Sequence, residues 1–129
     1  MKQVLILGAG AVARPAVGYL LEKEGVEVVV ASRTLEKAEA LVAGKPGGRA
    51  VALDAGDAPM LEKTIAAADI VVSFLPWTLH PVIAELCLAH GKHMVTTSYV
   101  KAEMQAMDRK ARDKGLIFLN EVGVDPGLD

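Results

Sequence analysis

The sequence contains few aromatic residues and a single cysteine. Phenylalanine, tryptophan and tyrosine together make up 4% of its 129 residues, so an apolar core must be built from aliphatic side chains. Cys87 has no partner for an internal disulfide, which favours a reducing compartment, and we expect the cytoplasm. Neither sign of charge dominates, because the formal net charge is −2 and lysine and arginine are spread along the chain. This distribution argues against a surface that binds nucleic acid.

Long hydrophobic runs are absent as well. The first apolar run, at residues 4–8, is too short for the core of a signal peptide. No stretch approaches the ~20 apolar residues that cross a membrane, so we expect no membrane partner. The three histidines and Cys87 do not follow the spacing of metal ligands, and no metal site is predicted.

Hydrophobic residues are, by contrast, abundant. They make up 52% of the chain against 23% charged residues, a balance that excludes an intrinsically disordered protein. The length and the uniform composition predict one domain over residues 1–129. The sequence stops shortly after its last apolar run, without a closing helix, so we expect a fragment of a longer protein.

Short runs rich in valine, isoleucine and leucine alternate with longer segments of helical period. The predicted strands are Val4–Leu7, Val26–Ala31, Ala50–Leu53, Ile70–Phe74, His93–Thr96 and Leu116–Leu119. The predicted helices are Ala11–Glu24, Leu35–Ala43, Pro59–Ala67, Pro81–His90 and Lys101–Lys114. Uninterrupted apolar strands are typical of a parallel sheet that is covered on both faces. The alternation therefore predicts an α/β protein with a doubly wound parallel sheet, the Rossmann fold, in the strand order 3-2-1-4-5-6.

A glycine-rich turn follows the first predicted strand. It reads Gly8-Ala9-Gly10-Ala11-Val12-Ala13, a G-x-G-x-x-A pattern that opens a helix. Gly8 permits a tight turn, Gly10 lets the backbone approach a pyrophosphate, and Ala13 lets the helix pack closely on the strand. The anion would lie on free N–H groups at the positive end of the helix dipole. We therefore predict a nucleotide site here; the alternative is a turn that only connects a strand to a helix.

The residues after the second predicted strand indicate which nucleotide is preferred. An NAD site carries an acidic residue about 20 residues beyond the glycines, where it accepts a hydrogen bond from the ribose 2′-hydroxyl. This chain has Ser32-Arg33-Thr34 there, and an arginine can bind a phosphate through two hydrogen bonds. The sequence therefore favours NADP, with NAD as the alternative. In a simpler interpretation, Arg33 is a solvated loop cation beside two capping hydroxyls.

Polar residues also follow the later strands, at the edge where open α/β sheets bind ligands. Asp54-Ala55 come after the third strand and are expected near the adenine. Leu75-Pro76 come after the fourth strand and are expected near the nicotinamide ribose. Thr97-Ser98-Tyr99 follow the fifth strand, and Asn120–Pro126 follow the sixth. Because strands five and six are predicted neighbours, these last two loops are expected to face each other.

Several of these segments resemble one protein family. The runs Leu75-Pro76, Lys92–Tyr99 and Asn120–Asp129 are similar to those of the saccharopine dehydrogenase family. The runs Gly8–Pro15 and Ser32–Ala38 are similar to its NADP-dependent, glutamate-forming branch, saccharopine reductase. The resemblance covers the whole chain, and its Ser-Tyr and Asp-Pro-Gly segments are more specific than the glycine-rich turn.

The resemblance implies a reversible reaction at a secondary amine, in lysine metabolism. The family joins 2-aminoadipate 6-semialdehyde to glutamate through an imine, which NADPH reduces to saccharopine. It also implies binding roles: Ala9, Gly10, Ala11 and Val12 at the pyrophosphate, Ser32, Arg33 and Thr34 at the 2′-phosphate, Asp54 and Ala55 at the adenosine, Leu75, Pro76, Thr97, Val124 and Pro126 toward the nicotinamide, and Ser98, Tyr99 and Asp125 at saccharopine. Tyr99 and Asp125 are the expected catalytic residues, because both can take part in proton transfer.

The carboxylates of saccharopine require arginine or lysine, and the loops named above contain no such cluster. In the family these groups come largely from a C-terminal substrate domain, which this chain lacks, so we expect the chain alone to be inactive.

Two other interpretations stay open. One is the NAD-dependent, catabolic saccharopine dehydrogenase or a related enzyme acting on a polyamine imine; the other is a non-catalytic domain that senses a nucleotide. The oligomeric state is not determined either, and a homodimer of the longer protein is one arrangement left open.

Purely structural roles compete with some of these functional ones. Tyr99 could only pack at the start of a helix, and Asp125 before Pro126 could only form a turn. Cys87 shares a helical stripe with Ile83 and Leu86, so we predict a core thiol and not a nucleophile.

Overall fold

The structure of the protein is a computed structural model, which describes residues 2–9, 13–42, 45–75, 79–96, 109–115 and 118–119. The strands are β1 Lys2–Leu7, β2 Val26–Ser32, β3 Gly48–Ala52, β4 Ile70–Ser73, β5 His93–Thr96 and β6 Phe118–Leu119. The helices are α1 Ala13–Leu21, α2 Leu35–Val42, α3 Ala58–Ala66 and α4 His80–His90, and residues 109–113 are also helical. The six strands form one parallel sheet in the order β3-β2-β1-β4-β5-β6, which confirms the predicted fold class and strand order.

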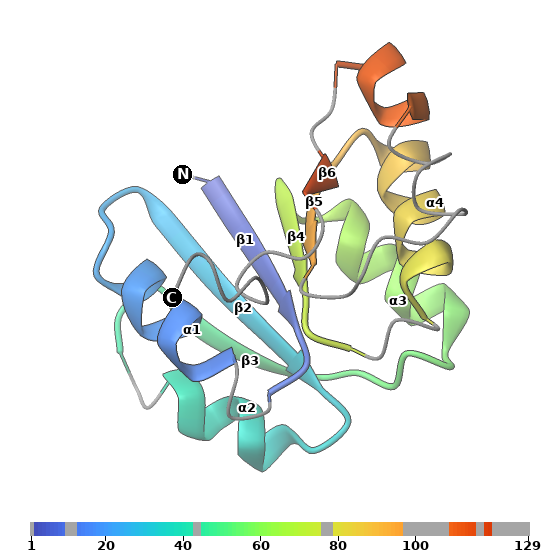
Figure 1. Ribbon diagram of the computed structural model, residues 1–129. Helices are drawn as coiled ribbons and strands as arrows, with labels where there is room; N and C mark the ends of the chain where they lie inside the picture. The colour runs from blue at the N-terminus through green and yellow to red at the C-terminus, as the bar shows by residue number, and fades with distance from the viewer. Residues whose placement is uncertain are drawn as a thin grey trace, which may run out of the picture.

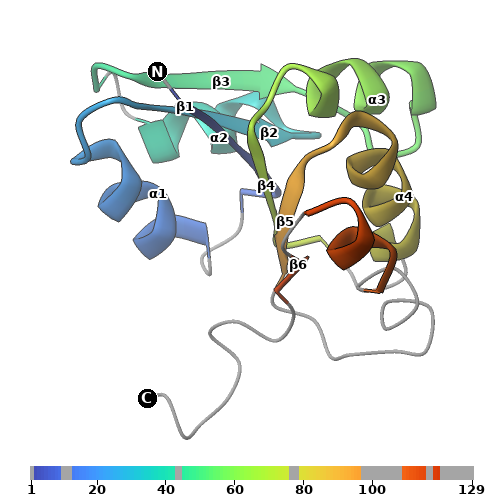
Figure 2. The ribbon, with the colours of Figure 1, turned by 90° about the horizontal axis from the view of Figure 1, so that it is seen from above.

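The sheet separates two apolar clusters, and β1 contributes alternate residues to each. Val4 and Ile6 join a cluster that includes Val17 of α1 and Leu41 of α2. Leu5 and Leu7 join a second cluster, which contains buried residues of α3 and α4. Figures 1 and 2 show α1 and the α3–α4 pair on opposite sides of the strands. Both faces are therefore covered, which explains why the strands are apolar without alternation.

Hydrogen bonds continue the sheet beyond the ends of its strands. The Gly8 N–H donates to the Ala31 carbonyl at 2.9 Å, and the Leu53 N–H donates to the Ser32 carbonyl at 2.9 Å. The Phe74 N–H donates to the Leu7 carbonyl at 2.8 Å. Because each bond lies at a carboxyl end, the loops after β1, β2, β3 and β4 are held at one edge of the sheet.

The amino end of the sheet is held by a carboxylate. The backbone N–H of Gln3 in β1 donates to Asp69 Oδ2 at 2.8 Å, just before β4 begins. This hydrogen bond lowers the pKa of Asp69 from its ordinary value of 3.8. The Gln3 side chain also donates to Glu27 of β2 at 2.8 Å. Side chains therefore connect three adjacent strands at the edge opposite the loops.

The bounds of several elements differ from the predicted ones by a few residues. α1 ends at Leu21, not at Glu24, because residues 22–25 form turns that lead into β2. A helix that began at Ala11 would lose a hydrogen bond at Pro15, but α1 begins at Ala13 and Pro15 lies in its first turn. No intrahelical partner is expected for a backbone N–H there, so the proline costs little.

The third strand also differs, because β3 begins at Gly48 and not at Ala50. Gly48, which lies before the predicted strand, pairs with Val28 of β2. Most of the predicted helix Lys101–Lys114 and the first half of the predicted strand Leu116–Leu119 lie outside the described residues. Within the described ranges, no helix is long and apolar enough to span a membrane.

Candidate functional site

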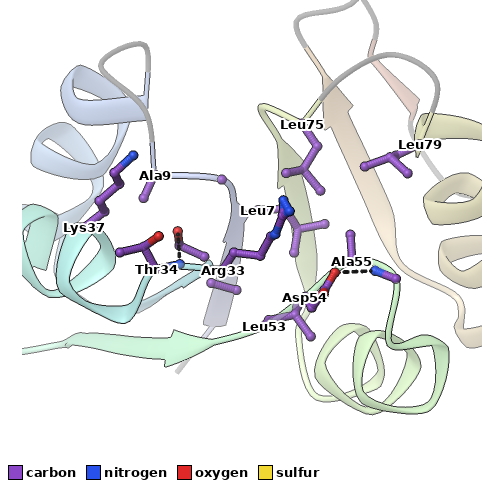
Figure 3. A pocket seen from close by; sticks show the side chains of 14 residues that line it. Leu7, Ala9, Arg33, Thr34, Lys37, Leu53, Asp54, Ala55, Leu75 and Leu79 are labelled. Carbon is purple, nitrogen blue, oxygen red and sulfur yellow. Dashed lines mark hydrogen bonds between the residues drawn. The ribbon is translucent and has the colours of Figure 1, made fainter.

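A cleft of about 580 Å³ opens at the carboxyl edge of the sheet (Figure 3). Its walls come from the loops after β1, β2, β3 and β4 and from the start of α2. The lining residues are Leu7, Gly8, Ala9, Ala31, Ser32, Arg33, Thr34, Lys37, Leu53, Asp54, Ala55, Gly56, Leu75 and Leu79. Segments more than 70 residues apart in the sequence thus meet around one cavity, because parallel strands place their carboxyl ends together.

The cleft brings together the predicted nucleotide-binding residues that lie within the described ranges. These are Gly8, Ala9, Ser32, Arg33, Thr34, Asp54, Ala55 and Leu75. Their clustering follows from the strand order, in which β1 is central and β2 and β4 are its direct neighbours. The sequence placed them on separate loops, and the sheet makes them parts of one site.

The remaining predicted site residues lie outside the described ranges. They are Gly10, Ala11, Val12, Pro76, Thr97, Ser98, Tyr99, Val124, Asp125 and Pro126. Their roles stay predictions. Residues 97–99 follow β5 in the sequence, and residues 124–126 follow β6. These two strands pair in parallel, with Met94 opposite Phe118.

Gly8 ends β1 with a backbone φ of +98°, a value that side chains rarely permit. A Cβ atom at this position would lie 3.5 Å from Leu75 Cδ2, which is an ordinary contact. The backbone conformation, and not a lack of space, therefore requires glycine here. The resulting turn directs Ala9 into the wall of the cleft.

The segment after β2 forms a compact polar turn that leads into α2. The Ser32 hydroxyl accepts a hydrogen bond from the Thr34 N–H at 3.1 Å. The Thr34 carbonyl accepts from the Lys37 N–H at 3.1 Å as the helix begins. The exposed Arg33 side chain extends across the cleft in Figure 3, and no residue within the described ranges bonds to it. The guanidinium is therefore available for an anion.

Asp54 begins a second turn, on the other side of the cleft. Its Oδ1 accepts from the Gly56 N–H at 2.8 Å, and its carbonyl accepts from the Asp57 N–H at 2.9 Å. Asp57 in turn caps α3, because its side chain accepts from the Met60 N–H. These bonds hold the exposed Asp54 carboxylate at the rim, where its second oxygen can accept from a ligand.

Sequence reasoning missed several residues of the cleft. Lys37 was not among the predicted site residues, although it follows Arg33 closely enough to reach the same loop. Leu53 and Gly56 flank the predicted Asp54-Ala55 pair and could have been found by extending it. Leu79 lies just before α4 and joins the cleft only through the fold, so no local pattern pointed to it.

Cys87 is confirmed as a core thiol. Its side chain is fully buried in the cluster that contains Ile83 and Met94, and it does not line the cleft. Burial raises its pKa to about 12, so the reactive thiolate is not formed near neutral pH. In the part of the chain that the structure describes, no three histidine, cysteine or acidic residues form a cluster suited to a metal ion.

The sheet order, the glycine turn after β1 and the cleft at the carboxyl edge define a Rossmann-type domain. Residues 4–119 match the family model described as the saccharopine dehydrogenase NADP binding domain. The chain therefore belongs to that family.

Individual relatives agree with this assignment. The chain is 43% identical over 129 residues to the saccharopine dehydrogenase [NADP(+), L-glutamate-forming] of Schizosaccharomyces pombe. The match covers 100% of this chain and 29% of that protein. It is 39% identical to the alpha-aminoadipic semialdehyde synthase of Arabidopsis thaliana, over 98% of this chain and 14% of the relative. The solved structure of the L-Glu-forming saccharopine dehydrogenase of Saccharomyces cerevisiae superposes with a TM-score of 0.89 at 36% identity, over 100% of this chain and 29% of that one. The chain thus spans less than a third of the length of these relatives.

Proposed function

We propose that this chain binds NADP(H) in the cleft at the carboxyl edge of its sheet. The observation that carries the proposal is the loop after β2, where Arg33 extends into the cleft between two hydroxyl residues and no acidic residue follows the strand. A carboxylate there would bind the 2′-hydroxyl of NAD and repel the 2′-phosphate of NADP. The guanidinium of Arg33 offers that phosphate two charge-assisted hydrogen bonds.

We propose that the other residues of the cleft contact the rest of the dinucleotide. Residues 9–12, which follow Gly8 in the sequence, are proposed to hold the pyrophosphate. Asp54 and Ala55, which line the cleft after β3, are proposed to contact the adenosine half, and Leu75, which lines it after β4, is proposed to lie toward the nicotinamide. The apolar side chains of Leu53 and Leu79 would exclude water from the bases.

We further propose that the longer protein reduces the imine of 2-aminoadipate 6-semialdehyde and glutamate to saccharopine, and catalyses the reverse reaction. Bound NADPH supplies the hydride, and the protein supplies orientation and charge. Tyr99 and Asp125 are the proposed catalytic residues, and Ser98 is proposed to contact saccharopine beside them. The names of the relatives, which include glutamate-forming saccharopine dehydrogenases, support this reaction.

Residues 1–129 are proposed to be the nucleotide-binding domain of that enzyme. The relatives are more than three times as long as the part that matches this chain. Groups that bind the carboxylates of saccharopine are proposed to lie in a substrate domain outside this sequence, so the chain alone should not turn over substrate. The buried, reduced Cys87 is consistent with the proposed cytoplasmic location.

The proposed function is tested by titrating NADPH and NADH into the wild-type chain and the Arg33→Ala variant. Two charge-assisted bonds at an exposed site contribute about 1.5–3 kcal/mol, so the variant should bind NADPH roughly 10- to 100-fold more weakly. NADH, which has no 2′-phosphate, should bind both proteins alike. Arg49→Ala removes an exposed arginine of β3 outside the cleft and should change neither affinity.

A second variant tests the preference from the opposite direction. Ser32→Asp adds a carboxylate for the 2′-hydroxyl of NADH and keeps an oxygen that can accept from the Thr34 N–H. It should shift the preference toward NADH. If Arg33→Ala weakened NADPH and NADH equally, Arg33 would support the fold and not the phosphate, and the NADP assignment would be wrong.

A further inference from the structure

We propose that Lys37 is a second cation of the nucleotide site, which binds the 2′-phosphate together with Arg33 and discriminates NADP from NAD. The inference rests on the proposed function and adds a specificity-determining residue to it. Lys37 lines the same cleft as Ser32, Arg33 and Thr34, although it belongs to α2 and not to the loop after β2.

The position of Lys37 in α2 directs its side chain toward the loop. It is the third residue of the helix, and its backbone N–H donates to the Thr34 carbonyl at 3.1 Å. Helical side chains tilt toward the N-terminus of their helix, so Lys37 reaches back over the turn that contains Thr34. Figure 3 shows its amine on the side of the cleft formed by Ala9 and Thr34.

The two cations extend into the cleft from different directions. In Figure 3 the Arg33 side chain crosses the middle of the cleft toward Leu7 and Asp54, whereas Lys37 stays on the side of Ala9. Both side chains are exposed, and the long stem of Lys37 is flexible, so each charged group could turn toward a phosphate held at the loop after β2. A phosphate monoester carries a charge of about −1.5 to −2 at pH 7, so one arginine leaves it only partly neutralised. A second cation completes the charge balance.

Interactions within α2 do not explain why a positively charged residue stands at position 37. A lysine in the first turn is close to the positive end of the helix dipole, where a cation is unfavourable. The positions three and four residues away are Thr34 and Arg33 on one side and Ala40 and Leu41 on the other, so no acidic partner is available along the helix. Within the described residues, none forms an ion pair with Lys37. An anionic ligand would explain why a lysine occupies this position.

Asp54 does not neutralise this cationic side of the cleft. It is the only acidic residue among those that line the cleft within the described ranges, and it lies across from Lys37. One of its oxygens is already bonded to the Gly56 N–H. A ligand phosphate near Lys37 would therefore meet two positive side chains without first displacing an ion pair.

The test is a Lys37→Met variant, which removes the charge and keeps most of the apolar stem. Lys45→Met is the matched control, because Lys45 is also exposed but lies after α2 and outside the cleft. Binding of NADPH, NADH, adenosine 2′,5′-bisphosphate and AMP would be measured at low ionic strength. We expect Lys37→Met to weaken NADPH and the bisphosphate by about 3- to 10-fold and to leave NADH and AMP unchanged. Lys37→Arg should retain most of the affinity, and Lys45→Met should resemble the wild type.

The outcomes separate this inference from the proposed function. If the wild type prefers NADPH and Lys37→Met keeps the full preference, the Lys37 role is wrong and the NADP assignment stands. A loss that is equal for NADPH and NADH would also overturn it, because the lysine would then act on shared parts of the cofactor or on the fold. Failure of the wild type to bind NADPH would instead refute the proposed function, and the role of Lys37 with it.

Discussion

Gly48, the first residue of β3, lies so close to α2 that there is no room for a side chain. A Cβ atom built there would lie 2.9 Å from Val42 Cβ, 3.0 Å from Leu21 Cδ2 and 3.1 Å from Val42 Cγ1. The end of the Leu21 side chain can move away, but the Val42 Cβ is fixed to the backbone of α2. Gly48→Ala must therefore shift β3 or α2, and we expect it to destabilise the protein.

The magnitude follows from the cost of overpacking a buried contact. One extra methyl in a packed interior typically costs about 1–3 kcal/mol, and Val42 is only 6% exposed. Part of that cost is offset because alanine loses less backbone entropy than glycine on folding. We expect a net loss of about 1–2 kcal/mol in the free energy of unfolding, measured by urea denaturation monitored by circular dichroism.

Gly18→Ala is the matched control. Gly18 lies within α1, and a Cβ atom there would have no neighbour within 4 Å. The same substitution should therefore stabilise the protein by about 0.5–1 kcal/mol, because alanine favours the helix. The two variants are predicted to shift the urea midpoint in opposite directions.

The responsible contact can be identified with a second substitution at Val42. Val42→Gly removes the Cβ that collides with the new methyl, whereas Val42→Ala keeps it. Combined with Gly48→Ala, the glycine variant should therefore show the larger favourable coupling in a double-mutant cycle. A Gly48→Ala protein as stable as Gly18→Ala would contradict the reasoning, since it would show that β3 and α2 separate at no cost.

Two further predictions concern titratable groups outside the cleft. Cys87 is buried and its pKa is raised to about 12, so in the native protein it should react with a disulfide reagent at pH 8 only as fast as the protein unfolds. In urea the reaction should be immediate. Rapid labelling of the native protein would show that the thiol is accessible. Asp69 has a lowered pKa because it accepts from the Gln3 N–H, so its carboxylate stabilises the fold above pH 3.8 and this contribution is lost as the pH falls through the folded-state pKa. Asp69→Asn should be less stable than the wild type at pH 7, and the difference should shrink below pH 3.8; a difference independent of pH would mean that the charge is not involved.

The sequence alone predicted most of the sheet and half of the cleft. Strands buried on both faces are apolar along their whole length, and the helices between them have a different period, so each element is visible locally. The glycine turn and the Ser32–Thr34 segment were also found locally, because a positive φ and a missing carboxylate are properties of single residues. The strand order then followed from the arrangement of two mononucleotide-binding halves, without any knowledge of contacts.

Tertiary contacts decided the rest. Gly48 can pair at the start of β3 because it has no side chain to collide with Val42 and Leu21, which pack against it. Leu79 belongs to the cleft because the segment before α4 is brought to the edge where β1, β2 and β4 end. Such proximity depends on how helices pack across the sheet, which no local pattern encodes. The sequence by itself therefore determined which elements form and which loops bear the site, and packing determined where β3 begins and which additional side chains reach the cleft.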